Sequence, residues 1–582
     1  MNPRWPIAVR AAISTAIPVV AGWAAGNVGS GLLATLGAFT SRFGGDRPYL
    51  NRGIQLAVVS VALAAAVAAG CWAAEVPWLG VAVVSAVAVA AVWLCNALAV
   101  GPPGAYVFAL ACAAGVGVSA QHLAPWQTGA LVLSGGAVAW LVQMAGALRG
   151  RRHPERAAVS AAGAAVAAYA EAIGSPDELA ARHRAATALH AAWNALISFQ
   201  LVERSDGTLQ LLRAANHALH VVFTDAMSAA AVGDEPAPDA AATARGIAAL
   251  ALPPETVATR DTDRVPLGRP AASTLLLRAL RPGSHIRHVM VRVAIAAPLA
   301  GAAASLLGIG HAYWAIAAAV LILHQGADRS RTLRRGADRL SGTWVGLALA
   351  AGILWLHPQG LWLALILAAL QLVIEMLVVR NYGLASVFIT AAALTIATGT
   401  REVDIAELLL ARGSDTLVGC AVGVAVFLVT SRFQESSRLV DSIADALDAA
   451  AATSAHLAAD TSTLAARTAR RDLQLAAIDL RDAADAAEAG SAVLRATGER
   501  LQPAVLATEH IAYGTITACW QMEKHGTDPL FGAGDARAYQ TQLHGLAISV
   551  RTATPPPELE TFPDFLADDV TALRDALRQN SR

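Results

Sequence analysis

The sequence predicts an all-α membrane protein with two parallel six-helix transmembrane repeats, each followed by a cytoplasmic helical domain. Of its 582 residues, 55% are hydrophobic and only 15% are charged, whereas about a quarter of a typical soluble chain is charged. Apolar segments of about 20 residues, which can cross about 30 Å of hydrocarbon, gather in two blocks. Arginine-rich stretches fall almost always on one side of these segments.

The first transmembrane block is predicted over residues 1–149 and the second over residues 285–432. The candidate spans are 7–26, 28–42, 52–74, 77–99, 104–122 and 126–148, then 286–308, 311–326, 340–357, 360–379, 383–400 and 408–431. Arg4 and Arg10 precede the first apolar run as in a signal peptide, but no small-residue cleavage site with a polar mature start follows. We therefore expect this segment to be a retained first helix.

Residues 150–284 and 433–582 are predicted to be helical cytoplasmic domains. Both are alanine-rich, with charged residues at helical spacing. In Arg182–Arg204, apolar residues that include Leu189 and Trp193 share one face, which is typical of a packed amphipathic helix.

The two blocks contain matching stretches at a nearly constant offset of about 280 residues. The matches are Val9–Pro18 with Val291–Pro298, Asp46-Arg47 with Asp328-Arg329, and Gly104–Gly115 with Gly383–Leu394. Because each block has an even number of predicted spans, the repeat would be parallel, related by an axis along the membrane normal.

The arginines also predict the orientation. Placing the N-terminus inside puts nearly every basic cluster inside, as the positive-inside rule requires. We expect a multi-pass protein of the bacterial inner membrane with both termini in the cytoplasm.

Several function classes are disfavoured. The net charge is zero, which argues against nucleic acid as a partner, and the five cysteines form no CxxC pair. No Walker A, GxSxG or HExxH motif occurs. The sequence therefore predicts no nucleotide, no cofactor, no metal and no enzymatic activity.

Motifs in the second block resemble a known family. They are Tyr313–Ala315, then Arg339 with Gly342-Thr343 and Gly346, then Arg380–Ala385 leading to Val387–Thr390. In their order and spacing the sequence resembles the fusaric-acid-resistance, or aromatic acid exporter, superfamily of integral membrane transporters. The first block departs from the pattern, with Pro103–Tyr106 in place of the Asn-Tyr signature.

The resemblance implies efflux of organic anions, with aromatic acids as one class, driven by the proton gradient. Plant anion channels similar to this superfamily pair two six-span subunits around a basic pore. The chain looks like such a pair fused into one polypeptide, so the pathway is expected between the two blocks.

The candidate substrate pathway comprises Arg380, Asn381, Tyr382, Arg339 and Thr343. Arginine can bind a carboxylate through two hydrogen bonds, and asparagine or threonine can add another. The alternative for the Gly342–Gly346 stretch is close helix packing. For Tyr313 and Trp314 the two interpretations are ring stacking on an aromatic substrate and a place in the interfacial aromatic belt.

Glu375, Arg412 and Asp415 are ionisable residues inside predicted spans, where a charge must be paired or functional. Glu375 is predicted either to pair with Arg380 or to carry the coupled proton. For Arg412 and Asp415 the alternative is mutual pairing.

The stretch Tyr313–Gly346 is predicted as an apolar helix, an arginine-rich loop and a second apolar helix. Together with Arg47 and Arg52, Arg329 and Arg335 of this loop would form a basic cytoplasmic mouth that attracts anions. The alternative is that these arginines are topology anchors bound to lipid phosphate.

Two other functions remain open. One is a gated anion channel on the same scaffold, and the other is a membrane-anchored helical scaffold that binds envelope partners. The sequence leaves open the substrate, the coupling ion, a homo-oligomeric state and an accessory subunit.

Overall fold

The computed structural model contains helices and no strand in the residues that it describes, so the prediction of an all-α fold is confirmed. The described residues are 4–118, 123–200, 207–231, 233, 237–249, 270–281, 284–309, 311–325, 329–398, 405–431, 437–459, 463–525, 532–558 and 566–580.

The chain divides into two compact units, each built from two separate stretches. Unit 1 comprises Met1–Arg151 and Pro270–Arg432, and unit 2 comprises Arg152–Arg269 and Phe433–Arg582. Unit 1 therefore contains both predicted transmembrane blocks, and unit 2 contains most of both predicted cytoplasmic segments.

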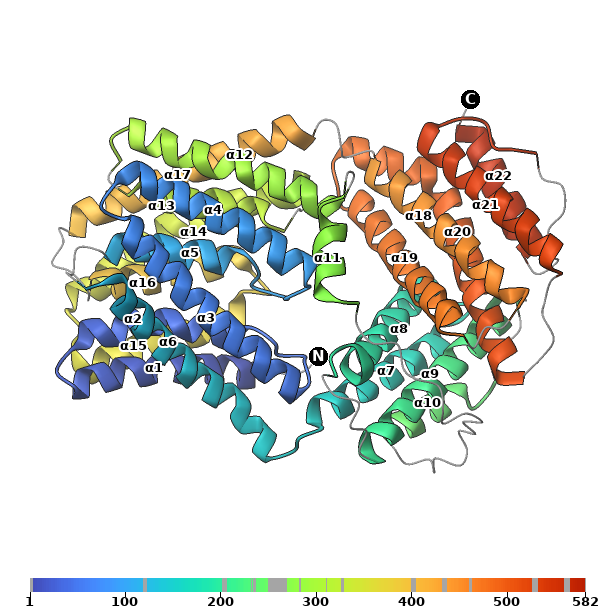
Figure 1. The fold of residues 1–582 in the computed structure, drawn as a ribbon, viewed down its shortest axis with the longest axis horizontal. Coiled ribbons are helices and arrows are strands. Elements are labelled where there is room, and N and C mark those ends of the chain that lie inside the picture. The colour runs from blue at the N-terminus through green and yellow to red at the C-terminus, as the bar shows by residue number, and fades with distance from the viewer. Residues whose placement is uncertain are drawn as a thin grey trace. The chain divides into compact units, whose positions relative to one another are not determined.

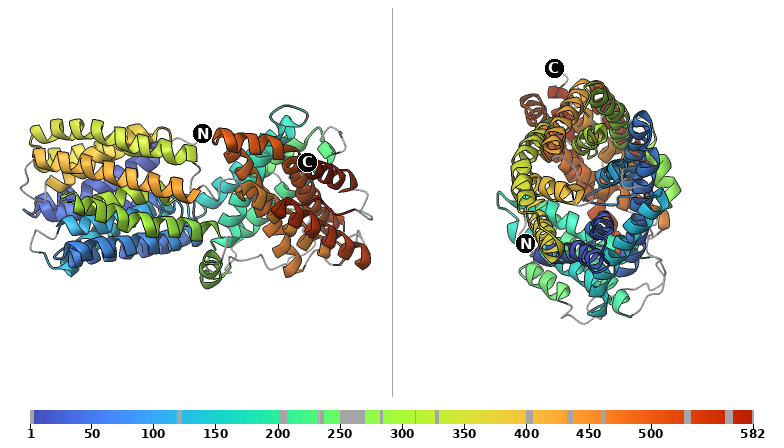
Figure 2. Two further views of the ribbon diagram at one scale, coloured as in Figure 1. Left: turned by 90° about the horizontal axis from the view of Figure 1, so that it is seen from above. Right: turned by 90° about the vertical axis from the view of Figure 1, so that its left-hand side faces the viewer.

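Helices occupy every predicted span in unit 1, and they run side by side (Figure 2). In the first half they are α1 (Trp5–Ala24), α2 (Val28–Ala38), α3 (Tyr49–Ala73), α4 (Pro77–Ala97), α5 (Tyr106–Val118) and α6 (Pro125–Met144). In the second half they are α12 (His285–Leu306), α13 (Ala312–Leu323), α14 (Arg329–Trp355), α15 (Gly360–Leu377), α16 (Tyr382–Thr398) and α17 (Ile405–Ser431), preceded by the short α11 (Ala272–Ala279).

Seven of the described helices are long and apolar enough to cross a membrane. They are α1, α3, α4, α6, α12, α15 and α17. By contrast, α2 has 11 residues and α13 has 12, so each rises only about 16–18 Å. Exposed tryptophans mark helix ends, as in an interfacial belt: Trp5, Trp23, Trp72, Trp78, Trp126, Trp355 and Trp362.

The predicted arginine-rich loop is wrong, because Arg329–Arg339 form the first turns of the 27-residue helix α14. Arginine, leucine and alanine favour helix, and no proline interrupts the sequence from Arg329 to Trp355. Arg334 also lies 4.0 Å from Asp338, an i,i+4 ion pair along the helix surface. The arginines are therefore held at fixed positions on one helix.

Equivalent helices make equivalent contacts in the two halves of unit 1 (Figure 1). Within the first half, α1 packs on α2, α2 on α6, and α3 on α5 and α6. Within the second half, α12 packs on α13, α13 on α17, and α14 on α16 and α17. Between the halves, α1 contacts α15 and α4 contacts α12, which are the same pair of positions with the halves exchanged.

Small residues permit the closest of these contacts. A Cβ atom added to Gly342 would lie 2.6 Å from the Cβ of Ser386, and one added to Gly346 would lie 2.6 Å from the Val387 carbonyl oxygen. The Gly342–Gly346 spacing therefore brings α14 against α16, as the packing alternative predicted.

Unit 2 is a helical unit whose main hydrophobic core draws on both of its stretches. The first contributes α7 (His153–Ala172), α8 (Glu178–Trp193), α9 (Gly207–Ala231) and α10 (Ala240–Ala248). The second contributes α18 (Ser437–Leu457), α19 (Leu464–Glu488), α20 (Ala492–His525), α21 (Ala533–Thr552) and α22 (Ala567–Asn580). Tyr169 and Leu189 lie in one hydrophobic cluster with Leu480 and Tyr539.

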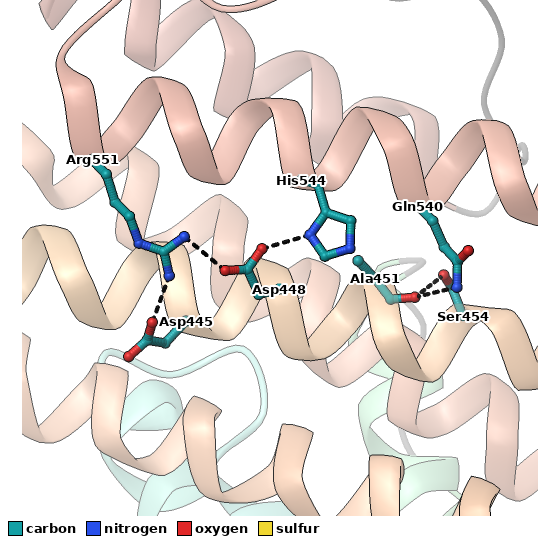
Figure 3. A network of polar contacts seen from close by, with 7 residues as sticks. All are labelled: Asp445, Asp448, Ala451, Ser454, Gln540, His544 and Arg551. Atoms are coloured by element: carbon teal, nitrogen blue, oxygen red, sulfur yellow. Dashed lines mark hydrogen bonds and ion pairs between the residues drawn. The ribbon is translucent and has the colours of Figure 1, made fainter. Parts of the chain in front are cut away.

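Polar contacts connect the helices of unit 2. Arg551 on α21 forms ion pairs with Asp445 and Asp448 on α18, and His544 lies 2.7 Å from Asp448 (Figure 3). In the interior, Glu509 lies 2.6 Å from Arg182 and also binds Arg481. Since Arg182 belongs to the first stretch and the other two to the second, this buried network helps to hold the stretches together.

Candidate functional site

Two of the buried arginines of unit 1 lie at the centre of what we call the arginine–aromatic cluster: Arg339, Arg412, Tyr382, Tyr106 and Trp314. Arg339 is 2% exposed and Arg412 is 4% exposed. Their helices, α14 and α17, pack against each other. Arg339 is close enough to Arg412 to act on it electrostatically, and Tyr106 is within electrostatic reach of both.

Arg339 is surrounded by neutral hydrogen-bonding groups. One Nη atom donates to the Ser386 hydroxyl at 3.3 Å, and the side chain also hydrogen-bonds to Tyr382. Its Nε has no hydrogen-bond partner among the described residues. No described carboxylate lies within the 4.0 Å that defines an ion pair, so the guanidinium charge is not neutralised locally.

Arg412 is held by an aromatic ring rather than by an acid. Its guanidinium carbon lies 3.8 Å from the centroid of Trp314, a close cation–π contact. Asp415, three residues further along α17, is fully buried, yet neither of its carboxylate oxygens has a hydrogen-bond partner in the described part of the chain. The predicted alternative of mutual Arg412–Asp415 pairing therefore does not appear as a direct ion pair.

Thr343 lies one helical turn beyond Arg339 on α14. It is fully buried, and no described group bonds to its hydroxyl oxygen. Its placement leaves it able to bind a further polar group.

Of the three residues Arg380, Asn381 and Tyr382, only Tyr382 lies in the cluster. Arg380 is exposed at the turn between α15 and α16. The Asn381 side-chain oxygen accepts a hydrogen bond from the Leu384 N–H at 3.0 Å and thereby caps the start of α16.

Glu375 forms an ion pair with Arg42, at 2.9 Å, and not with Arg380. Gln371 donates to the same carboxylate at 3.0 Å and accepts a hydrogen bond from Arg42 at 3.2 Å. Because Arg42 follows α2 and Glu375 lies on α15, this pair connects the two halves of unit 1.

The four residues of the predicted basic mouth occupy different environments. Arg47 and Arg52 are buried and donate to backbone carbonyl oxygens of Ala99 and Gly45, each at 2.6 Å. Arg329 is exposed, whereas Arg335 is partly buried, with one Nη atom lacking a partner among the described residues. The bond from Arg47 therefore connects the loop before α3 to the loop after α4, and the bond from Arg52 holds the loop before α3 against its helix.

Sequence reasoning missed three members of this region. Tyr106 lies in a stretch that departs from the family pattern, and Trp314 was considered for ring stacking or for the interfacial belt but not included in the pathway. His324 is 4% exposed, and its ring lies 6.1 Å from that of Tyr106. All three are aromatic side chains with a polar atom, within or at the end of an apolar helix, and this feature could have indicated them from the sequence.

The charges of the cluster belong to the second half alone. The stretches Leu50–Gly53 and Leu333–Gly336 correspond, and extending this register places Leu56 opposite Arg339. Leu56 is fully buried and apolar. The first half thus supplies only Tyr106 to the cluster.

Span-length apolar helices packed side by side, with tryptophans at their ends, define a multi-span helical membrane protein. Residues 299–426 match the family model described as fusaric acid resistance protein-like. The predicted resemblance is thereby confirmed, and the chain carries a fusaric acid resistance-like membrane domain in its second half.

The chain is also similar, at 24% identity over 547 residues, to the uncharacterized membrane protein YvaC of Bacillus subtilis (strain 168). The similarity covers 88% of this chain and 85% of that protein. No solved structure matches the chain.

Proposed function

We propose that this protein transports organic anions across the membrane, with Arg339 and Arg412 as successive binding positions. The observation that carries the proposal is that both guanidinium groups are buried without a carboxylate within ion-pair distance among the described residues. Burying a cation whose charge is not neutralised costs on the order of several kcal/mol per ion. A bound anion would offset this cost.

The groups around the arginines suit a carboxylate on an aromatic or other apolar body. Guanidinium and carboxylate form paired hydrogen bonds, and the free Thr343 hydroxyl adds a donor. Tyr382, Tyr106 and Trp314 offer ring surfaces. Because two arginines offer neighbouring binding positions, the anion can pass from one to the other instead of being held at a single tight site.

The two arginines would bind at different depths. Arg339 lies ten residues into α14 and Arg412 seven residues into α17, about 15 Å and about 10 Å along their helices. If consecutive spans alternate in direction, α14 and α17 begin at opposite membrane faces. Arg335, one turn before Arg339, would then receive the anion at the first face.

The fold and orientation proposed from the sequence fit this pathway. The matching helix contacts in the two halves support a parallel repeat. The arginine distribution supports a bacterial inner-membrane protein with cytoplasmic termini, so that Arg335 lies toward the cytoplasm. Exchange against protons that move inward down their gradient would then drive export.

Asp415 is our candidate for proton coupling. Its buried carboxylate lacks a hydrogen-bond partner in the described region, whereas Glu375 is engaged by Arg42. A carboxyl group that takes up a proton as an anion leaves would couple the two movements.

The test is flux of a radiolabelled aromatic carboxylate, benzoate, in proteoliposomes with and without an imposed pH gradient. We expect gradient-dependent benzoate flux that Arg339→Leu strongly lowers and that the exposed-site control Arg184→Leu preserves. Benzoate flux that requires Arg339 but is equal with and without the pH gradient would identify a gated anion channel. Absence of any carboxylate flux through the folded protein would refute the proposal.

A further inference from the structure

The short helix α11 lies against the end of α4 and the start of α12. The indole nitrogen of Trp93, four residues before the end of α4, donates to the Leu276 carbonyl oxygen at 3.2 Å. This bond and the packing of Ala279, which is 2% exposed, fix α11 at one end of the helices of unit 1.

The side chains of α11 divide into three sectors around its axis. At 100° per residue, Leu275, Leu276 and Ala279 face the protein and are buried or half-buried. Leu277 and Leu280 form the next sector and are 67% and 40% exposed.

The third sector of α11 is basic. The exposed Arg278 follows the leucine sector around the axis, and a second exposed arginine, Arg281, lies two residues beyond the end of α11. Because the packed, apolar and basic sectors succeed one another in this order, a helix lying flat at a membrane surface would immerse its leucines while its arginines stay at the headgroup level.

The exposed leucines continue the apolar outer surface of the adjoining helices. On α12, Val291, Ile295 and Leu299 are spaced four residues apart, and each is more than 40% exposed. On α4, Leu94 is 41% exposed beside Trp93. In a membrane protein this stripe faces lipid, so α11 begins where the acyl region ends.

We propose that α11 is an interfacial helix that binds anionic phospholipid. Leu277 and Leu280 enter the boundary between headgroups and acyl chains, and Arg278 and Arg281 bind headgroup phosphates. Charge complementarity favours an anionic headgroup over a neutral one, since juxtamembrane arginines are attracted to anionic leaflets. This inference does not depend on what the protein transports.

The test measures how deeply α11 lies in the bilayer. The native cysteines are all buried, so a cysteine introduced at Leu277 in the full-length protein can be spin-labelled selectively. Collision rates with oxygen and with a water-soluble nickel chelate then report immersion. Leu464, 64% exposed on unit 2, is the matched leucine control, and Thr274 samples the basic sector.

We expect the label at position 277 to collide more with oxygen than with the nickel chelate, and those at 274 and 464 to show the reverse. In vesicles of phosphatidylcholine, adding phosphatidylglycerol should deepen the label at 277. The double substitution Arg278→Gln with Arg281→Gln should abolish that deepening, whereas Arg184→Gln should not.

Three results would overturn the inference. The label at 277 could be as accessible to the nickel chelate as that at 464, which would place the leucines in water. It could be shielded from both reagents, which would mean that protein covers them. Immersion that is equal with and without phosphatidylglycerol would exclude anionic lipid as the ligand.

Discussion

Replacing Arg339 by leucine should stabilise the membrane unit while it stops anion transport. Burying a guanidinium group costs on the order of several kcal/mol, even after the surrounding protein relaxes. The bonds to Ser386 and Tyr382 return about 1.5–3 kcal/mol as bonds to a charged group. An unsatisfied buried Nε costs about 1–3 kcal/mol. The balance predicts that Arg339→Leu raises the free energy of unfolding by about 1–3 kcal/mol.

The same substitution removes the charge that would bind a carboxylate. Loss of a charge-assisted hydrogen bond of about 1.5–3 kcal/mol corresponds to a fall in benzoate flux of about 10- to 150-fold. The change in stability is measured by titrating the detergent-solubilised protein with a denaturing surfactant and monitoring its unfolding. The change in transport is measured as benzoate flux in proteoliposomes. Opposite changes in stability and flux are the signature of a residue retained for function.

Arg52→Leu is the matched control, because Arg52 is equally buried but donates to the Gly45 carbonyl oxygen and stacks on Tyr49. This variant should lose stability, since it removes both the hydrogen bond and the stacking on Tyr49 that offset the burial of Arg52. If Arg339→Leu destabilised the protein as much as Arg52→Leu, or if it left benzoate flux unchanged, the reasoning about an unneutralised functional charge would be wrong.

Three further outcomes are expected. Asp415→Asn should retain benzoate flux but lose its dependence on the pH gradient; gradient dependence that survives would remove Asp415 from the coupling step. Glu509→Gln should destabilise unit 2 by about 3 kcal/mol, because it leaves Arg182 and Arg481 without their shared carboxylate; hydrogen exchange of α20 peptides measures this loss. Burial lowers the pKa of His220 from 6.5 to about 4. Since the unfolded chain binds this proton first, unit 2 should lose up to about 3 kcal/mol as the pH falls from 6.5 to 4, with no effect above 6.5; His220→Gln should flatten this part of the hydrogen-exchange profile.

The positions of the helices in unit 1 followed from the sequence because apolar length and aromatic ends are local features. The start of α14 was misjudged, since arginine density was read as a loop although arginine favours helix. The partner of Glu375 was missed because Arg42 lies 333 residues earlier in the chain, a contact that only packing of α15 against the first half creates. Asn381 was predicted to bind substrate because the sequence alone does not distinguish a substrate-binding asparagine from one that caps a helix. The distinction requires the first residue of α16.

The distribution of charge explains why the family resemblance is sharp in one half and faint in the other. Residues 299–426, which match the family model, include Arg339, Arg412 and Asp415. In the first half, the close contacts persist, with Gly70 and Gly115 bringing α3 against α5 as Gly342 and Gly346 bring α14 against α16. Helix packing therefore constrains both halves, whereas the charged residues of the arginine–aromatic cluster are confined to the second. A transport pathway that uses these charges would therefore run beside α14 and α17.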